Sequence, residues 1–163
     1  MKRKHTSAIA AAAAVALSAA IAIPALTQAQ TPAATTITFQ EKVQTVAMDD
    51  IAPKSKTGKV SIGDRLITRQ SLFDAAKKRV GTLYTDCTGV GPTKPFSTAT
   101  LLCRLAYTLS DGQIVAVGQF KLDGSGRVPI VGGTGAYASA RGSISSAKPA
   151  KGFDSADLIT IGG

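Results

Sequence analysis

Apolar and polar residues alternate along most of the chain beyond residue 35, with the period of two that is typical of β-strands. Clusters of Gly, Pro, Asp and Ser interrupt the alternation at short intervals, and Ser110-Asp111-Gly112 is a strong signal for a tight hairpin. No segment has the length and period of an ordinary helix. The predicted strands are 36–48, 65–73, 80–89, 98–109, 113–122, 128–131, 142–147 and 154–161. Eight short strands at near-regular spacing predict an all-β protein, either a closed antiparallel barrel or a sandwich.

The same alternation predicts which side chains face the interior. In each strand the more apolar face is taken as the inward one, which leaves Asp86 pointing outward. The small side chains of Ala116 and Gly118 would leave room inside, and an eight-stranded barrel is just wide enough to be filled or to hold one small ligand. The inward positions expected in the three central strands are Leu83, Thr85, Cys87, Leu101, Cys103, Leu105, Tyr107, Leu109, Ile114, Ala116, Gly118, Phe120 and Leu122.

The first residues have the features of a secretory signal peptide. Basic residues at 2–5 precede an alanine-rich apolar run at 8–23, then Pro24 and small residues at 27 and 29 that suit cleavage near Ala29. A retained membrane anchor is the alternative, but the apolar run is shorter than the roughly 20 residues that span a bilayer. The expected organisation is therefore a signal peptide at 1–29, a disordered lead-in at 30–35 and one domain at 36–163. Such a protein is secreted, and it meets a membrane only through its transient signal peptide.

Composition excludes several kinds of chemistry. The chain has 19 Lys and Arg against 10 Asp and Glu, a formal charge of +9, and loss of the signal peptide leaves +6. The single histidine, His5, lies in that signal, so the mature chain cannot build a Ser–His–Asp or Cys–His nucleophile. Two cysteines are too few for an ordinary zinc site. We expect no metal and no cofactor.

The two cysteines, Cys87 and Cys103, lie on either side of the turn-rich stretch 89–95. A hairpin centred on residue 95 sets position 87 opposite position 103, which is the register that a cross-strand disulfide needs. Export would permit such a bond. Two buried free thiols are the alternative.

A glycine-rich segment carries the strongest motif. Residues 130–142 read Ile-Val-Gly-Gly-Thr-Gly-Ala-Tyr-Ala-Ser-Ala-Arg-Gly, and the glycines permit a bend at a barrel end with Tyr137 packed under it. The segment also fits the pattern G-x-G-x-x-A with Asp154 about 20 residues later, a sign of dinucleotide binding. No adequate helix follows, and too little chain remains for a doubly wound sheet, so we reject that alternative.

This segment resembles the signature of the allene oxide cyclase-like and dirigent-like β-barrel proteins. The resemblance extends over residues 36–163, with further similarity at 63–66, 72–74, 78–82 and 109–114. The two cysteines are similar to those of secreted bacterial members. It implies an eight-stranded antiparallel β-barrel. The signature residues, with an expected structural role, are Gly132, Gly133, Thr134, Gly135, Tyr137, Arg141 and Gly142.

The resemblance implies a cofactor-free barrel that binds a small apolar, phenolic or epoxide-like molecule and steers its cyclisation or coupling. Positioning and exclusion of water supply much of such catalysis. The small number of aromatic residues argues against lignan-like coupling. The candidate ligand-binding residues are Tyr107, Leu105, Phe120 and Thr85, and the candidate catalytic residues are Tyr107, Asp123 and Arg127, with Asp86 and Arg104 weaker.

Two other functions stay open. The barrel could be a non-catalytic extracellular or cell-envelope binding module whose basic clusters, Lys77-Lys78-Arg79 and Lys54, Lys56 and Lys59, contact an anionic cell-surface polymer. It could also be a structural domain with a filled core. A catalyst requires an open lumen with an ionisable group inside. Nucleic acid is not an expected partner, because no aromatic residues accompany the basic clusters. A homo-oligomer is compatible with the sequence.

Overall fold

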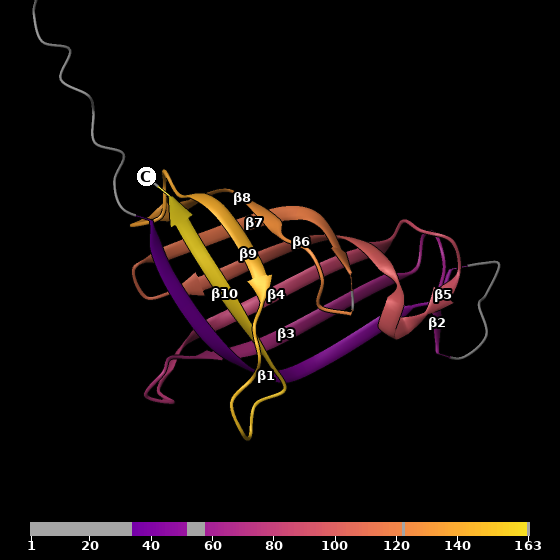
Figure 1. The fold of residues 1–163 in the computed structure, drawn as a ribbon, viewed down its shortest axis with the longest axis horizontal. Helices are drawn as coiled ribbons and strands as arrows, with labels where there is room; N and C mark the ends of the chain where they lie inside the picture. The colour runs from indigo at the N-terminus through magenta and orange to yellow at the C-terminus, as the bar shows by residue number, and fades with distance from the viewer. Residues whose placement is uncertain (1–33, 52–57, 122, 163) are drawn as a thin grey trace, which may run out of the picture. The chain divides into compact units, whose positions relative to one another are not determined.

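Eight long strands close into an antiparallel barrel in the order β1-β10-β9-β8-β7-β6-β4-β3 (Figure 1). The computed structural model describes residues 34–51, 58–121 and 123–162. Of the two architectures expected from the alternation, the barrel is confirmed. Its strands are β1 (Thr35–Asp49), β3 (Arg65–Phe73), β4 (Arg79–Gly89), β6 (Thr100–Leu109), β7 (Gly112–Lys121), β8 (Val128–Gly135), β9 (Arg141–Ser146) and β10 (Ser155–Gly162).

A small second sheet is an element that the sequence pattern did not predict. Strands β2 (Lys59–Val60) and β5 (Lys94–Pro95) pair antiparallel, and a single 3₁₀ turn, Phe96–Thr98, follows. Strands of two residues are too short to show a period, which is why they were missed. The 3₁₀ turn also delays the start of β6 from the expected residue 98 to Thr100.

The glycine signature lies within a strand, which corrects the prediction that β8 ends at residue 131. Residues Gly132–Gly135 pair with the start of β7, and the chain turns only afterwards. The glycines permit this pairing because a Cβ at Gly133 would lie 2.0 Å from the Gln113 carbonyl oxygen. Tyr137 in the turn packs against the core as expected, and its hydroxyl donates to the Asp111 carboxylate at 3.2 Å.

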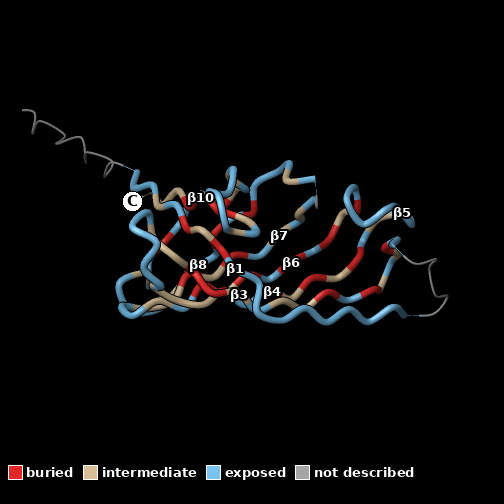
Figure 2. The backbone as a smooth tube through the Cα atoms, turned by 90° about the horizontal axis from the view of Figure 1, so that it is seen from below, coloured by how far each residue is buried: buried red, intermediate tan, exposed pale blue. Residues whose placement is uncertain are grey.

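Inward and outward positions follow the predicted parity. Figure 2 shows buried residues alternating with exposed ones along the central strands. Tyr107 and Ile114 are completely buried, and the Phe39 ring stacks on Tyr107 with a centroid distance of 6.3 Å. Leu122, also expected inside, is outside the described residues. The core is therefore built from the expected faces of β4, β6 and β7.

The predicted disulfide is confirmed. Cys87 and Cys103 are directly paired across β4 and β6, with an S–S distance of 2.06 Å and a Cα–Cα distance of 4.0 Å. The bond joins two neighbouring strands of the barrel wall. The proposed signal peptide at 1–29 lies outside the described residues, and none of the helical structure within the described ranges could cross a membrane.

Replacing both cysteines, Cys87→Ala with Cys103→Ala, should lower the free energy of unfolding by about 3 kcal/mol, because the cross-link closes a loop of 16 residues in the unfolded chain. Urea unfolding monitored by circular dichroism measures the change. Reduction of the wild-type protein before unfolding separates loss of the cross-link from loss of the sulfur atoms' packing. Equal midpoints for the oxidised and reduced wild type would contradict the prediction.

Candidate active site in the barrel lumen

A cavity of about 180 Å³ lies inside the barrel and is partly open to solvent. It occupies the half of the lumen bounded by the starts of β3, β6, β8 and β10 and the ends of β4, β7 and β9. The lumen is therefore not completely filled by core side chains. The lining residues are Glu41, Leu66, Thr68, Gln70, Leu83, Thr85, Cys87, Cys103, Leu105, Phe120, Val128, Ile144, Ser146, Ser155 and Asp157.

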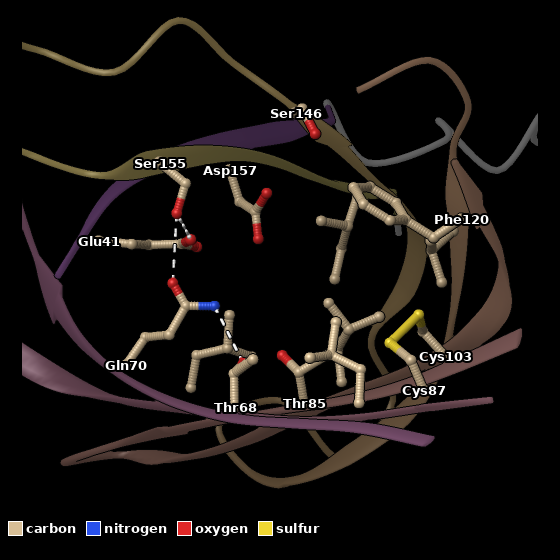
Figure 3. Close-up of a pocket in the computed structure, with 15 residues that line it drawn as sticks. Glu41, Thr68, Gln70, Thr85, Cys87, Cys103, Phe120, Ser146, Ser155 and Asp157 are labelled. Carbon is tan, nitrogen blue, oxygen red and sulfur yellow. Dashed lines mark hydrogen bonds between the residues drawn. A yellow bond between two sulfur atoms is a disulfide. The ribbon is translucent and has the colours of Figure 1, made fainter. Parts of the chain in front are cut away.

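The wall of this cavity has an apolar arc and a polar arc. Figure 3 shows Glu41, Gln70 and Ser155 on one side, and Phe120 with the disulfide on the other. Aliphatic side chains of β3, β4, β6, β8 and β9 complete the apolar arc. A molecule bound here would have its apolar body against one wall and its polar atoms against the other.

Two carboxyl groups define the polar arc, and strand parity brings them inside. Glu41 has the same parity as Phe39 in β1, and Asp157 has the same parity as Ile159 in β10. The register pairs Phe39 with Asp157 and Glu41 with Ser155, so the two acids are diagonal neighbours on the inner face. Glu41 is only 2% exposed and Asp157 is 9% exposed.

Tyr107 supports Asp157 from across the barrel. Its strand, β6, lies on the opposite side of the barrel from β10, and its hydroxyl donates a hydrogen bond to Asp157 Oδ2. The tyrosine is completely buried and is not among the residues that line the cavity. Its phenol orients the carboxylate that faces the cavity.

Burial controls the protonation of this cluster. Burial, the negative charge of Asp157 and a hydrogen bond with Asp157 together raise the pKa of Glu41 to about 9, although the hydrogen bond from Ser155 opposes the rise. Burial also raises the pKa of Asp157, although hydrogen bonds from Glu41 and Tyr107 oppose the rise. The pKa of Tyr107 is raised well above its ordinary value, first by burial and then by the two acids. At neutral pH, Glu41 therefore holds a proton.

A hydrogen-bond chain fixes one oxygen of Glu41 and leaves the other open. The Ser155 hydroxyl donates to Glu41 Oε2 at 2.6 Å, and Ser155 Oγ also lies 3.2 Å from Gln70 Oε1. Gln70 Nε2 donates to Thr68 Oγ1 at 3.3 Å. Glu41 Oε1 and Thr85 Oγ1 are buried without a hydrogen-bond partner. Both atoms belong to the cavity wall.

Of the residues predicted to bind a ligand, Thr85, Leu105 and Phe120 line the cavity. The catalytic candidates Asp123 and Arg127 are exposed in the connection between β7 and β8, where Asp123 accepts a hydrogen bond from the Ser125 amide at 2.8 Å. They are not brought together with the acids of the lumen. A role for either residue stays a prediction.

Asp86 and Arg104 lie on the outer face of the barrel. Asp86 points outward as predicted and forms an ion pair with Arg65 at 2.6 Å, which lowers the pKa of the Asp86 carboxyl. Arg104 is exposed and is paired in register with Asp86. This ion pair belongs to the outer surface.

The Lys77-Lys78-Arg79 cluster lies on the surface as well. Lys77, Lys78 and Arg79 are exposed at the turn between β3 and β4, while Lys54 and Lys56 are outside the described residues. Contact with an anionic polymer stays a prediction. Within the described ranges, no three His, Cys, Asp or Glu side chains are grouped so that they could hold a metal ion.

Glu41 and Asp157 are the two functional candidates that the sequence pattern did not single out. The alternation of inward and outward positions could have indicated them, because each acid lies two residues from a buried apolar residue on the same face of its strand. A carboxylate at an inward position is unusual enough to mark a site.

The fold and the cavity define this chain as a small, closed, eight-stranded β-barrel with a partly open lumen. Within that class, the chain belongs to the family described as the allene oxide cyclase barrel like domain, whose model matches residues 40–154. Among curated proteins, none matches the chain by sequence.

Solved structures of several proteins share this fold. A pyocyanin demethylase is 24% identical with a TM-score of 0.63, covering 77% of this chain and 99% of its own. The exo-specific intermolecular Diels-Alderase AbnU is 14% identical with a TM-score of 0.60, covering 80% and 99%. A pterocarpan synthase dirigent protein is 16% identical with a TM-score of 0.59, covering 82% and 96%. At these identities the likeness shows the fold alone.

The buried proton of Glu41 should make folding stability fall as pH rises. Because the folded-state pKa of about 9 lies above the ordinary value of 4.5, this contribution is fully present below about pH 4.5 and is lost as pH rises through about 9. The free energy of unfolding should fall by up to about 1.4 kcal/mol per pH unit in this window. Urea unfolding at several pH values measures the slope. Glu41→Gln should reduce the slope to the part contributed by Asp157, whose pKa burial also raises.

The exposed carboxylate Asp49, at the far end of the same strand, supplies the matched control, and Asp49→Asn should keep the wild-type slope. The carboxylates with lowered pKa, at Asp64, Asp86 and Asp123, titrate below this window and do not interfere. A wild-type stability that is flat between about pH 5 and pH 9 would contradict the buried proton.

Proposed function

We propose that this chain is an exported, cofactor-free barrel that binds one small apolar, phenolic or epoxide-like molecule in its lumen and steers its cyclisation or isomerisation. The observation that carries the proposal is the buried carboxyl of Glu41 at the wall of a largely apolar cavity, where burial and the neighbouring Asp157 raise its pKa to about 9. A carboxylic acid that keeps its proton at neutral pH can act as a general acid. It needs no histidine and no metal to do so.

The acid cluster divides the work between two carboxyl groups. Glu41 donates its proton to an oxygen of the substrate as the carbon–oxygen bond of an epoxide breaks, and Asp157 stabilises the developing positive charge. After rearrangement, the product oxygen returns the proton to Glu41. The substrate and product are isomers, so the step consumes no other reagent. Two carboxyl groups in one environment with unequal proton affinity are the usual arrangement for such a division.

The volume of the cavity favours an intramolecular reaction. A space of about 180 Å³ lies below the range of roughly 300–1,000 Å³ that holds a drug-sized ligand. Coupling of two phenolic molecules would need room for both reactants. Cyclisation or isomerisation of one molecule needs only that the wall hold a single conformer.

Two further observations support the proposal. The names of structural relatives, a Diels-Alderase and a dirigent protein, describe barrels of this fold that guide reactions of small organic molecules. The disulfide between Cys87 and Cys103 is the kind of bond that persists outside the reducing cytosol, which is consistent with export.

Racemic styrene oxide is a suitable probe, because its acid-catalysed isomerisation to phenylacetaldehyde needs only a proton donor. The wild-type protein should consume one enantiomer faster than the other, measured by chiral gas chromatography near pH 6. Glu41→Gln should lower the rate by about 100-fold or more, since general acid catalysis contributes that much. Asp49→Asn should retain the wild-type rate and selectivity, because its carboxylate is exposed.

Consumption of both enantiomers at the rate of buffer alone would contradict an acid acting on epoxides in this lumen. If the protein nevertheless bound a small ligand there, the barrel would be the non-catalytic binding module that the sequence left as an alternative. Equal loss of activity in Asp49→Asn and Glu41→Gln would assign the effect to general destabilisation.

A further inference from the structure

The charge of the cavity wall selects among ligands. Glu41 and Asp157 are the ionisable side chains of the described lining, and none of the lining residues is Lys, Arg or His. A carboxylate or phosphate group would lose its hydration on entry and meet acidic groups without a compensating cation. An anion is therefore a poor ligand for this lumen.

Two buried polar atoms show which hydrogen bonds a ligand could make. Glu41 Oε1 and Thr85 Oγ1 have no partner, and their residues are 2% and 9% exposed. Buried polar groups in folded proteins nearly always have a hydrogen-bond partner, so both atoms indicate a place for a polar group from outside the chain. Asp157 accepts a hydrogen bond from the Tyr107 hydroxyl and also shares a hydrogen bond with Glu41. An acceptor oxygen of a ligand would therefore take the Glu41 O–H in competition with Asp157.

The remaining wall limits the size and character of the ligand. Phe120 lies across the cavity from Glu41 (Figure 3), and the apolar side chains of Leu83 and Leu105 also line the cavity. An apolar cavity of about 150 Å³ is known to accommodate benzene. The 180 Å³ measured here therefore suits a single ring with a short substituent and not a fused polycyclic molecule.

We propose that the lumen takes an uncharged molecule of about one ring that bears an acceptor oxygen, with the ring against Leu105 and Phe120 and the oxygen toward Glu41, and that it rejects anions. This inference rests on the proposed function, because it names the class of molecule on which the acid would act. Monocyclic ketones, enones, lactones and ethers share this chemistry.

Four commercial compounds separate charge, polarity and size. Acetophenone is the neutral ligand with an acceptor oxygen, α-methylstyrene has the same shape without the oxygen, and benzoate has a similar size with a negative charge. The fourth, 2-acetonaphthone, adds a second ring. Titration of the purified oxidised protein near pH 6, followed by isothermal calorimetry and by amide shifts in β4, β6 and β10, should give acetophenone the lowest Kd. The other three should bind at least about 5-fold more weakly, the α-methylstyrene difference being that of one hydrogen bond.

Variants of the wall locate the contacts. Glu41→Leu should bring acetophenone and α-methylstyrene to equal affinity, because the O–H donor is lost while an apolar side chain fills the position. Phe120→Ala should admit 2-acetonaphthone with at least about 5-fold tighter binding than in the wild type. Tyr84→Ala removes an aromatic ring from β4 that is 43% exposed on the outside of the barrel, and it should leave all four affinities unchanged.

Benzoate or 2-acetonaphthone binding as tightly as acetophenone to the wild type would overturn the inference, as would binding of none of the neutral single-ring compounds. If Glu41→Leu does not fold, the wild-type ranking and Phe120→Ala still decide the outcome. The proposed function fails separately. Selective binding of acetophenone without conversion of styrene oxide would support the ligand class and contradict the catalytic role. Conversion of styrene oxide with the opposite ligand ranking would support the catalytic role and contradict the ligand class.

Discussion

The hydrogen bond from Tyr107 to Asp157 joins opposite walls of the barrel and makes an acidic lumen compatible with folding. A lone carboxyl in an apolar interior carries a large desolvation cost, which a hydrogen-bond donor and a shared proton reduce. Asp157 accepts a hydrogen bond from the Tyr107 hydroxyl. Beside it, Glu41 retains its proton and accepts a hydrogen bond from the Ser155 hydroxyl. The cavity, its polarity and its proton all depend on this arrangement.

Strand pairing also explains why most polar groups of the wall lie close together. Glu41 and Ser155 are paired across β1 and β10, and Gln70 comes from β3 on the other side of β1. The polar residues lie mainly on the adjacent strands β10, β1 and β3, with Ser146 on β9 and Thr85 on β4 beside them, while β6, β7 and β8 contribute apolar side chains and one cysteine of the disulfide. The register of the sheet thus brings residues that are distant in sequence together on the cavity wall.

Much of the fold could be predicted from the sequence because a half-buried strand repeats every two residues. That period located β3 to the residue and set Cys87 opposite Cys103. It failed where sterics or length override it: the glycines of β8 pair where a turn was expected, and β2 is too short to have a period. The site was harder to find, since Glu41 and Asp157 interrupt the apolar contrast that identifies an inward face. Their meeting depends on the closure of β1 onto β10, which pairs the two ends of the chain's folded part.

The glycine signature lies at the opposite end of the barrel from the cavity. A Cβ at Gly142 would lie 1.9 Å from the Thr160 carbonyl oxygen, and one at Gly135 would lie 2.2 Å from that of Asp111, so these positions tolerate no side chain where the strands close. The glycine-rich segment thus shapes the strand pairing at this end of the barrel, and it supplies none of the residues that line the cavity. Substitutions at the cavity end can change which ligand fits without altering these glycine positions. The residues that stabilise one end of the barrel are therefore separate from the residues that select a ligand at the other.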